Sequence, residues 1–148
     1  MSVTSVRNLS EPPPGGAQLY FGAGIPGFPR ARVFFVQPWG TEPTPFFVLE
    51  SQDVSGLCFV TVNPAVFFPW YEPELGEEIY RAIDANGRDD VELMVILTLH
   101  ARPQDATANL LGPVVVNVRT GQAVQAVLSG SGFDPQTPIA TSTKPAAS

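Results

Sequence analysis

Frequent prolines and glycines divide this 148-residue chain into short segments, because 16 of its residues are proline and 13 are glycine. Proline interrupts helices and glycine favours turns, so the pattern argues against long helices. Hydrophobic residues make up 44% of the chain, which is enough for a core, and this length favours a single domain. We therefore expect one domain built from many short elements.

Short apolar runs rich in valine and phenylalanine, bounded by Gly, Pro, Asn and Asp, are typical of β-strands. Runs of this kind lie at 18–22, 32–36, 46–50, 57–62, 91–99, 114–118 and 124–128. The last two predict a hairpin, because the short loop between them contains Gly121. In the run at 91–99, apolar residues occur at both odd-numbered and even-numbered positions, which predicts a strand that is buried on both faces. The expected fold is mainly β: a small antiparallel β-barrel, closed or nearly closed.

One short helix is expected between Pro73, which suits a first turn, and Asn86-Gly87, which would end it. An apolar stripe that recurs every fourth residue would pack this helix on the barrel: Leu75, Ile79 and Ile83.

The two ends of the chain are polar or rich in Pro and Gly, and we expect both to be flexible. The predicted organisation is an N-terminal arm at 1–16, a barrel domain at 17–135 and a disordered tail at 136–148. The N-terminus lacks the pattern of a signal peptide, and the longest aliphatic run, 93–97, is too short to span a membrane.

The net charge of −6 is concentrated in one part of the chain. Residues 72–92, called the acidic segment below, hold eight of the 14 acidic residues but only two of the eight basic ones. An acidic protein is unsuited to binding nucleic acid through its phosphates, so no direct nucleic-acid contact is expected. The segment is either a solvated face or a surface that selects a basic partner and repels polyanions.

No residue pattern predicts catalysis, a metal or a cofactor. Gly22–Gly27 matches the G-x-G-x-x-G motif, but strand-like sequence follows where a nucleotide site needs a helix, so we expect a tight turn. His100 and Cys58 are too few to form a zinc site, and Cys58 is expected to be a small core residue. Asn109 and Asn117 interrupt apolar sequence, where an Asn side chain commonly satisfies backbone groups.

Trp70 and Tyr71 stand immediately before the acidic segment. They are either plugs for a loop or anchors for a binding partner, since both residue types are frequent in binding hot spots. From the residues alone, the chain is a protein-binding domain without a named partner.

Five stretches in order resemble the family of the flagellar assembly factor FliW. They are similar to its Gly-Leu-Pro-Gly-Phe turn, its Pro-Phe-x-x-Leu-Gln-Ser strand, its long Asp-Pro…Tyr-Glu block, the start of its next strand and its Val-Asn-Leu-x-Ala-Pro-Ile-Val-Ile-Asn hairpin. In this chain they lie at 24–28, 45–51, 63–75, 90–91 and 108–117, and the similarity extends from about Gln18 to Phe133.

The resemblance implies a β-barrel of the bacterial cytoplasm that is not an enzyme. It implies two protein partners: CsrA, an RNA-binding translational regulator, and flagellin. Combined with the charge pattern, it gives a hypothesis in which the acidic segment opposes the positive surface of CsrA. The residues predicted to bind partners are Phe68, Trp70, Tyr71, Glu72, Glu74, Glu77, Glu78 and Asn109.

Two other interpretations remain open at this point. A small-molecule-binding barrel, or an enzyme of unrecognised type, would need a sizeable apolar pocket, for example near His100. A barrel interior filled by phenylalanine side chains would argue against it. A structural assembly subunit would associate with itself instead of binding CsrA.

Overall fold

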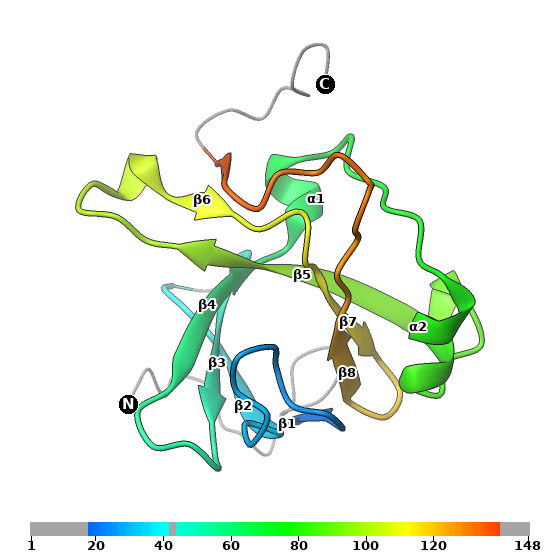
Figure 1. Ribbon diagram of the computed structural model, residues 1–148. Coiled ribbons are helices and arrows are strands. Elements are labelled where there is room, and N and C mark those ends of the chain that lie inside the picture. Colours follow the sequence, from blue (N-terminus) through cyan, green and yellow to red (C-terminus); the bar gives the residue numbers. More distant parts are fainter. Residues whose placement is uncertain (1–17, 42–43, 140–148) are drawn as a thin grey trace.

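The computed structural model describes residues 18–41 and 44–139, which form a β-barrel with short helices on its outer side (Figure 1). The predicted N-terminal arm at 1–16 lies outside the described residues, as does most of the predicted tail. The sequence's division at residue 135 is too early, because ordered structure continues to Ile139.

Seven strands close the barrel within the described part of the chain. They are Gln18–Phe21 (β1), Val33–Pro38 (β2), Phe46–Ser51 (β3), Cys58–Val62 (β4), Val91–Thr98 (β5), Val114–Asn117 (β7) and Gln122–Gln125 (β8). Their order is β4-β3-β2-β1-β8-β7-β5, and β4 pairs with β5 to complete the ring. All pairs are antiparallel except β1 with β8, which is parallel. The predicted mainly β barrel is therefore confirmed, with one parallel pair that the sequence did not indicate.

Phenylalanine and valine side chains fill the interior of the barrel. Phe21 and Phe34 are fully buried there, and their ring centroids lie 5.3 Å apart in an edge-to-face arrangement. Phe59 extends this contact, with its ring 6.0 Å from that of Phe34. This filling is the observation that argues against a small-molecule-binding barrel.

Two further clusters lie on the outer side of the barrel wall. Strand β5 contributes to the core inside the barrel and to both outer clusters. Met94 and Ile96 pack into the interior. Val95 and Leu97 belong to the second cluster, and Val91 belongs to the third. The prediction that this strand is covered on both faces is confirmed. The second cluster is covered by the two-residue strands Thr107–Ala108 (β6) and Thr137–Pro138 (β9), which pair with each other beyond the barrel (Figure 1).

The described chain contains two short α-helices where the sequence predicted one. Helix α1 is Pro64–Phe67, and Asn63 caps it by accepting a hydrogen bond from the backbone N–H of Ala65 at 3.0 Å. The sequence missed it because four residues carry no helical periodicity, although Asn followed by Pro is a known helix start. Single turns of 3₁₀-helix occur at Arg88–Asp90 and Pro103–Asp105.

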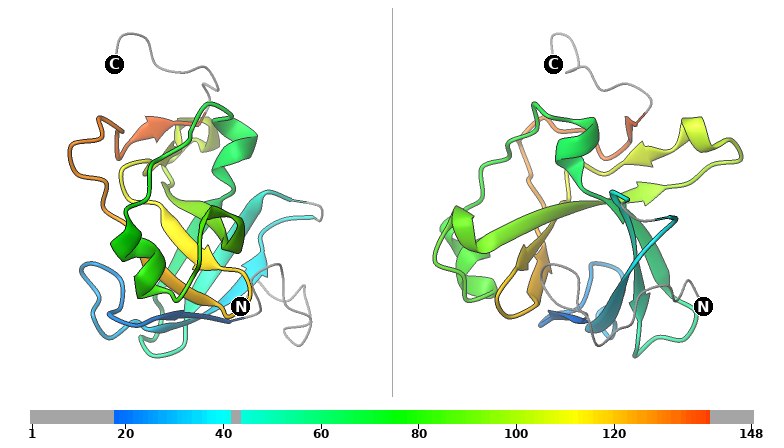
Figure 2. Two further views of the ribbon diagram at one scale, coloured as in Figure 1. Left: turned by 90° about the vertical axis from the view of Figure 1, so that its right-hand side faces the viewer. Right: turned by 180° about the vertical axis from the view of Figure 1, so that it is seen from behind.

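Helix α2, Glu77–Ala82, is shorter than expected at both ends. Residues before it are extended up to Gly76, which occupies the N-cap, so Pro73 does not begin the helix. At the other end Asp84 adopts a left-handed conformation with φ 58°, so the helix stops before Asn86-Gly87. The predicted stripe nevertheless packs on the outer side of the β7–β8 hairpin (Figure 2), with Leu75 and Ile79 half-buried and Ile83 fully buried.

Two smaller expectations have opposite outcomes. The glycine-rich stretch 22–27 is a tight turn, in which Gly24 has φ 77° and a Cβ would lie 2.5 Å from the carbonyl oxygen of Pro29. Cys58 is exposed, so its predicted place in the core is wrong. It opens β4 on the outer face of the barrel, because the next residue, Phe59, points into the interior.

Candidate functional site

The acidic segment runs across the outside of the barrel between α1 and β5, through α2 (green in Figure 1). Seven of its eight acidic side chains are exposed, and the eighth, Asp90, is half-buried. These carboxylates lie on one ordered segment that carries only two arginines, Arg81 and Arg88, so the segment is strongly negative. We call the surface of this segment the acidic surface.

Buried aromatic side chains support the beginning of this surface. Phe68 is fully buried, and Tyr71 is 7% exposed, so only a small part of the Tyr71 ring is accessible. The Tyr71 hydroxyl donates a hydrogen bond to the carbonyl oxygen of Leu110 at 2.7 Å, and its ring meets the ring of Phe133 at 4.8 Å. A partner contact by Phe68 and Tyr71 stays a prediction, and the structure shows both packed beneath the backbone at the start of the acidic surface.

Burial also changes the acid–base behaviour of Tyr71. Its hydroxyl lies in an apolar cluster, where the negative phenolate would lose the stabilisation that water provides. Burial therefore raises the pKa of Tyr71 well above its usual value. The phenol stays protonated at neutral pH and remains a hydrogen-bond donor to Leu110.

A row of aromatic rings connects this support to the neighbouring surface. Trp70 is half-buried and packs edge-to-face on Phe68 at 5.8 Å. From Phe68 the row continues through Phe67 of α1 and Phe46 of β3 to Trp39, with ring centroids 5.7–6.5 Å apart. Trp39, at one end of the row, is 40% exposed, and Val66, which precedes Phe67 in α1, is 55% exposed. Trp70 thus belongs to a partly exposed apolar area next to the acidic surface.

The carboxylates at the start of α2 interact with the end of the helix. Glu77 and Glu78 occupy the first turn, where the backbone N–H groups give the helix a positive end. Glu78 folds back over Gly76, since a Cβ at Gly76 would collide with its carboxylate. Because these atoms are the mobile end of a long side chain, a Cβ at position 76 would displace the Glu78 carboxylate at little cost.

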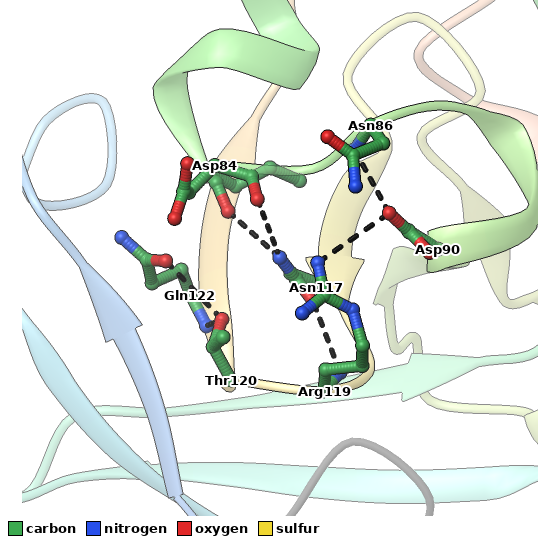
Figure 3. Close-up of polar contacts among 8 residues, drawn as sticks. Asp84, Asn86, Asp90, Asn117, Arg119, Thr120 and Gln122 are labelled. Carbon is green, nitrogen blue, oxygen red and sulfur yellow. Dashed lines mark hydrogen bonds and ion pairs between the residues drawn. The ribbon is translucent and has the colours of Figure 1, made fainter.

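Asn117 fixes the far end of the acidic segment to the barrel (Figure 3). Its side chain is fully buried at the end of β7. The amide nitrogen donates to the carbonyl oxygens of Ile83 and Asp84, at 2.9 and 3.2 Å, and the amide oxygen accepts from the backbone N–H of Arg119 at 2.9 Å. One buried side chain therefore joins the turn after α2 to the β7–β8 hairpin.

Asp90 provides a second connection in the same place (Figure 3). Its carboxylate accepts a hydrogen bond from the backbone N–H of Asn86 at 2.8 Å and lies 3.5 Å from the guanidinium of Arg119. Its own carbonyl oxygen accepts from the backbone N–H of Val118. Asp90 thus has a structural role in addition to its charge.

Asn109 lies apart from the carboxylates. Its side-chain oxygen accepts hydrogen bonds from the backbone N–H groups of Leu111 and Gly112, at 3.1 and 2.9 Å, which shapes the turn before β7. The sequence interpretation that Asn109 and Asn117 satisfy backbone groups is confirmed for both. A partner contact by Asn109 stays a prediction, because its side chain is half-buried and engaged in this turn.

A hollow of about 240 Å³ lies between the start of α1 and β5, beside the acidic surface. Its lining is about half polar and half apolar, and the apolar part comes from Phe47, Pro64, Ala65, Tyr71, Leu93 and Met94. Two charged side chains, Arg88 and Glu92, also line it. Arg88 further lines a more open groove with Glu72, Glu74 and Tyr80, so the two depressions meet at this side chain. Sequence reasoning missed the hollow, because its walls come from three separate segments.

The described residues show no arrangement typical of catalysis or metal binding. In that part of the chain, no three His, Cys, Asp or Glu side chains are grouped so that they could hold a metal ion. His100 is exposed at the end of β5. Among the helices described, none has the length and apolar character needed to cross a membrane. The hollow is also smaller than most ligand pockets, which begin at about 300 Å³.

Comparison with known proteins gives a consistent result. A family model described as "FliW protein" matches residues 15–139. The flagellar assembly factor FliW of Bacillus subtilis strain 168 is 38% identical over 121 residues, which cover 82% of this chain and 84% of the relative. That of Shouchella clausii strain KSM-K16 is 35% identical over 126 residues, covering 85% and 86%. A crystal structure of the flagellar assembly factor FliW superposes with a TM-score of 0.76 at 32% identity, covering 83% of this chain and 85% of that one.

Proposed function

The chain belongs to the FliW family, and from this membership we propose that it is a flagellar assembly factor that acts by binding other proteins and not by catalysis. We propose CsrA and flagellin as its partners and the cytoplasm as the place where it works. Binding of CsrA would withdraw that regulator from the flagellin message, and binding of unsecreted flagellin would occupy the factor. The synthesis of flagellin would thereby follow its export.

The acidic surface is the observation that supports an encounter with CsrA. A protein that holds RNA must present positive charge, and a surface with a net charge of −6 attracts such a partner over a distance of about 10 Å at moderate salt. The same carboxylates repel the RNA phosphates. Antagonism would therefore not require the factor to cover the RNA site itself.

The ordered backbone around these carboxylates strengthens the proposal. Asn117 and Asp90 fix the end of the acidic segment, and Phe68 and Tyr71 fix its beginning. A backbone that is already ordered loses little further freedom when a partner binds, so more of the attraction between charges remains as affinity. The exposed carboxylates that we expect to face CsrA are those of Glu72, Glu74, Glu77 and Glu78.

Flagellin, by contrast, would use apolar contacts. Trp39 and Val66 are exposed apolar side chains and Trp70 is half-buried, and we propose that a chain terminus of flagellin contacts them. We therefore place the flagellin contact beside the acidic surface. Replacing Val66 by Ser and Trp39 by Ala would be expected to weaken flagellin binding more than CsrA binding.

Charge reversal tests the CsrA proposal. Glu74→Lys combined with Glu78→Lys should lower the association rate with purified CsrA by roughly tenfold at low salt, and should flatten its salt dependence. Glu50→Lys on β3, outside the acidic segment, is the control for Glu74→Lys alone, since each changes the net charge by two units, and it should have a smaller effect. Stopped-flow or surface-binding kinetics at several salt concentrations give both quantities. An unchanged rate and salt slope in the double variant would mean that the segment is only a solvated face.

A further inference from the structure

We propose that the hollow beside β5 binds an extended segment of a protein partner, in which an apolar side chain is flanked by basic ones. The proposal rests on the proposed function, because it assigns a place and a binding mode to a basic partner of the acidic surface. Three features of the hollow carry it: a stretch of the β5 edge that pairs with no strand in the described part of the chain, an apolar part of the lining and carboxylates beside it.

The first feature is the open edge of β5. The carbonyl oxygens of Asp90 and Ile96 accept hydrogen bonds from the backbone N–H groups of Val118 and Asn109. The backbone N–H and C=O groups of the even-numbered residues in this strand therefore point toward β7 and β6. In antiparallel pairing the backbone N–H and C=O groups of the odd-numbered residues then point to the opposite edge of the strand. Val95 meets Val62 of β4 there. Leu93 lies two residues further along the same edge.

Proline ends the pairing at this point. Continuing the register in which Val62 faces Val95 would place Pro64 opposite Leu93. Pro64 has no N–H group and turns the chain into α1, so it supplies no ladder hydrogen bond. The peptide group of Leu93 therefore faces the hollow, where a short extended peptide could bind to it as an added strand.

The second feature is the apolar part of the lining, which suits one side chain of such a peptide. Phe47, Ala65, Tyr71 and Met94 line a space of about 240 Å³. This volume is too small for most drug-sized ligands, whose pockets begin at about 300 Å³, but it fits an anchoring side chain. A peptide that adds to a strand edge places alternate side chains in such pockets.

The third feature is charge, which decides the kind of peptide. Glu92 lines the hollow, and Glu72 and Glu74 line the groove that meets it at Arg88. All three carboxylates are exposed. The guanidinium of Arg88 lies 3.4 Å from the carbonyl oxygen of Val91, on the same open edge. Arg88 thus occupies the position where we expect a basic side chain of the partner to lie.

Pairs of variants that change the net charge equally, one inside the depressions and one outside them, distinguish a docking site from the general electrostatic field of the acidic surface. Glu92→Gln and Glu74→Gln remove one negative charge inside the depressions, whereas Asp84→Asn removes one outside them. Asn tolerates the left-handed conformation of Asp84, so the control should fold normally. Arg88→Ala and Arg81→Ala form the corresponding basic pair.

The probe is purified CsrA, titrated by calorimetry against the full chain and each variant at low salt. We expect Glu92→Gln and Glu74→Gln to weaken binding about two- to fivefold each, and Arg88→Ala to strengthen it by a similar factor. Asp84→Asn and Arg81→Ala should each change the dissociation constant by less than about 1.5-fold, as is usual for screened charges away from a contact.

Three outcomes decide the question. A larger effect of the groove variants than of their controls supports the inference. Equal effects within each pair would overturn it while leaving the electrostatic proposal for CsrA in place. Failure of the unmodified chain to bind CsrA at any salt concentration would overturn both.

Discussion

Replacement of Asn117 by Leu removes the connection between the acidic segment and the barrel at nearly constant side-chain volume. The substitution leaves the carbonyl oxygen of Ile83 and the backbone N–H of Arg119 without their partners. A buried polar group that loses its hydrogen bond destabilises a protein by about 1–3 kcal/mol. The carbonyl oxygen of Asp84 is only partly buried and adds less. We therefore expect a loss of about 2–4 kcal/mol in the free energy of unfolding.

Urea unfolding followed by tryptophan fluorescence measures this loss. Thr120→Val is the matched control, since Thr120 lies in the same hairpin and its side-chain hydrogen bonds with Gln122 are exposed. The control should change stability by less than about 0.5 kcal/mol. Hydrogen exchange should also show that the backbone amides of residues 77–91 exchange faster in Asn117→Leu, because the turn after α2 is no longer held.

The combination of results decides whether Asn117 positions the acidic surface. A loss below about 1 kcal/mol, with unchanged exchange at 77–91, would refute the reasoning, since a buried amide with three hydrogen bonds would then contribute almost nothing. Asn117→Leu leaves the net charge unchanged. If this variant remains folded but binds CsrA more weakly, the position of the carboxylates matters as well as their charge.

Two further expectations concern the core and the glycine turn. Tyr71→Phe should lower stability by about 1–3 kcal/mol, because the buried carbonyl oxygen of Leu110 loses its donor. Burial raises the pKa of Tyr71, so its contribution should be full below about pH 10 and decline as the pH rises further; the pH dependence of unfolding should lack this decline in Tyr71→Phe. Gly24→Ala should destabilise more than Gly27→Ala by at least about 1 kcal/mol, because both have positive φ but only the Cβ at Gly24 would collide with Pro29. Thermal unfolding compares the two; equal losses would contradict this account of the turn.

The sequence predicted the barrel because its signals are local. Short apolar runs rich in valine and phenylalanine mark β2, β3 and β4, aliphatic runs mark β5 and β7, and Gly121 marks the hairpin. Strands β6 and β9 have only two residues each, too few for any periodicity, and their pairing depends on the covered face of β5. The start of α2 was misplaced because Pro73 and Leu75 fit a helix locally, whereas tertiary packing keeps them extended.

The candidate site was predictable in its charge but not in its shape. Composition alone located the acidic segment, since its residues are contiguous. Burial of Phe68 and Tyr71 was not predictable, because aromatic residues beside a charged segment serve equally well as core or as surface. The hollow forms only where β3, α1 and β5 pack together in the folded chain, and no local sequence pattern indicates that packing.

Co-purification from the native cell tests the central claim, that this barrel presents an acidic surface to a protein partner, most directly. The tagged chain would be recovered from cells that export flagellin and from cells in which export is blocked. We predict that CsrA accompanies it in the first case and that flagellin replaces CsrA in the second. Recovery of neither protein in either condition would contradict the account.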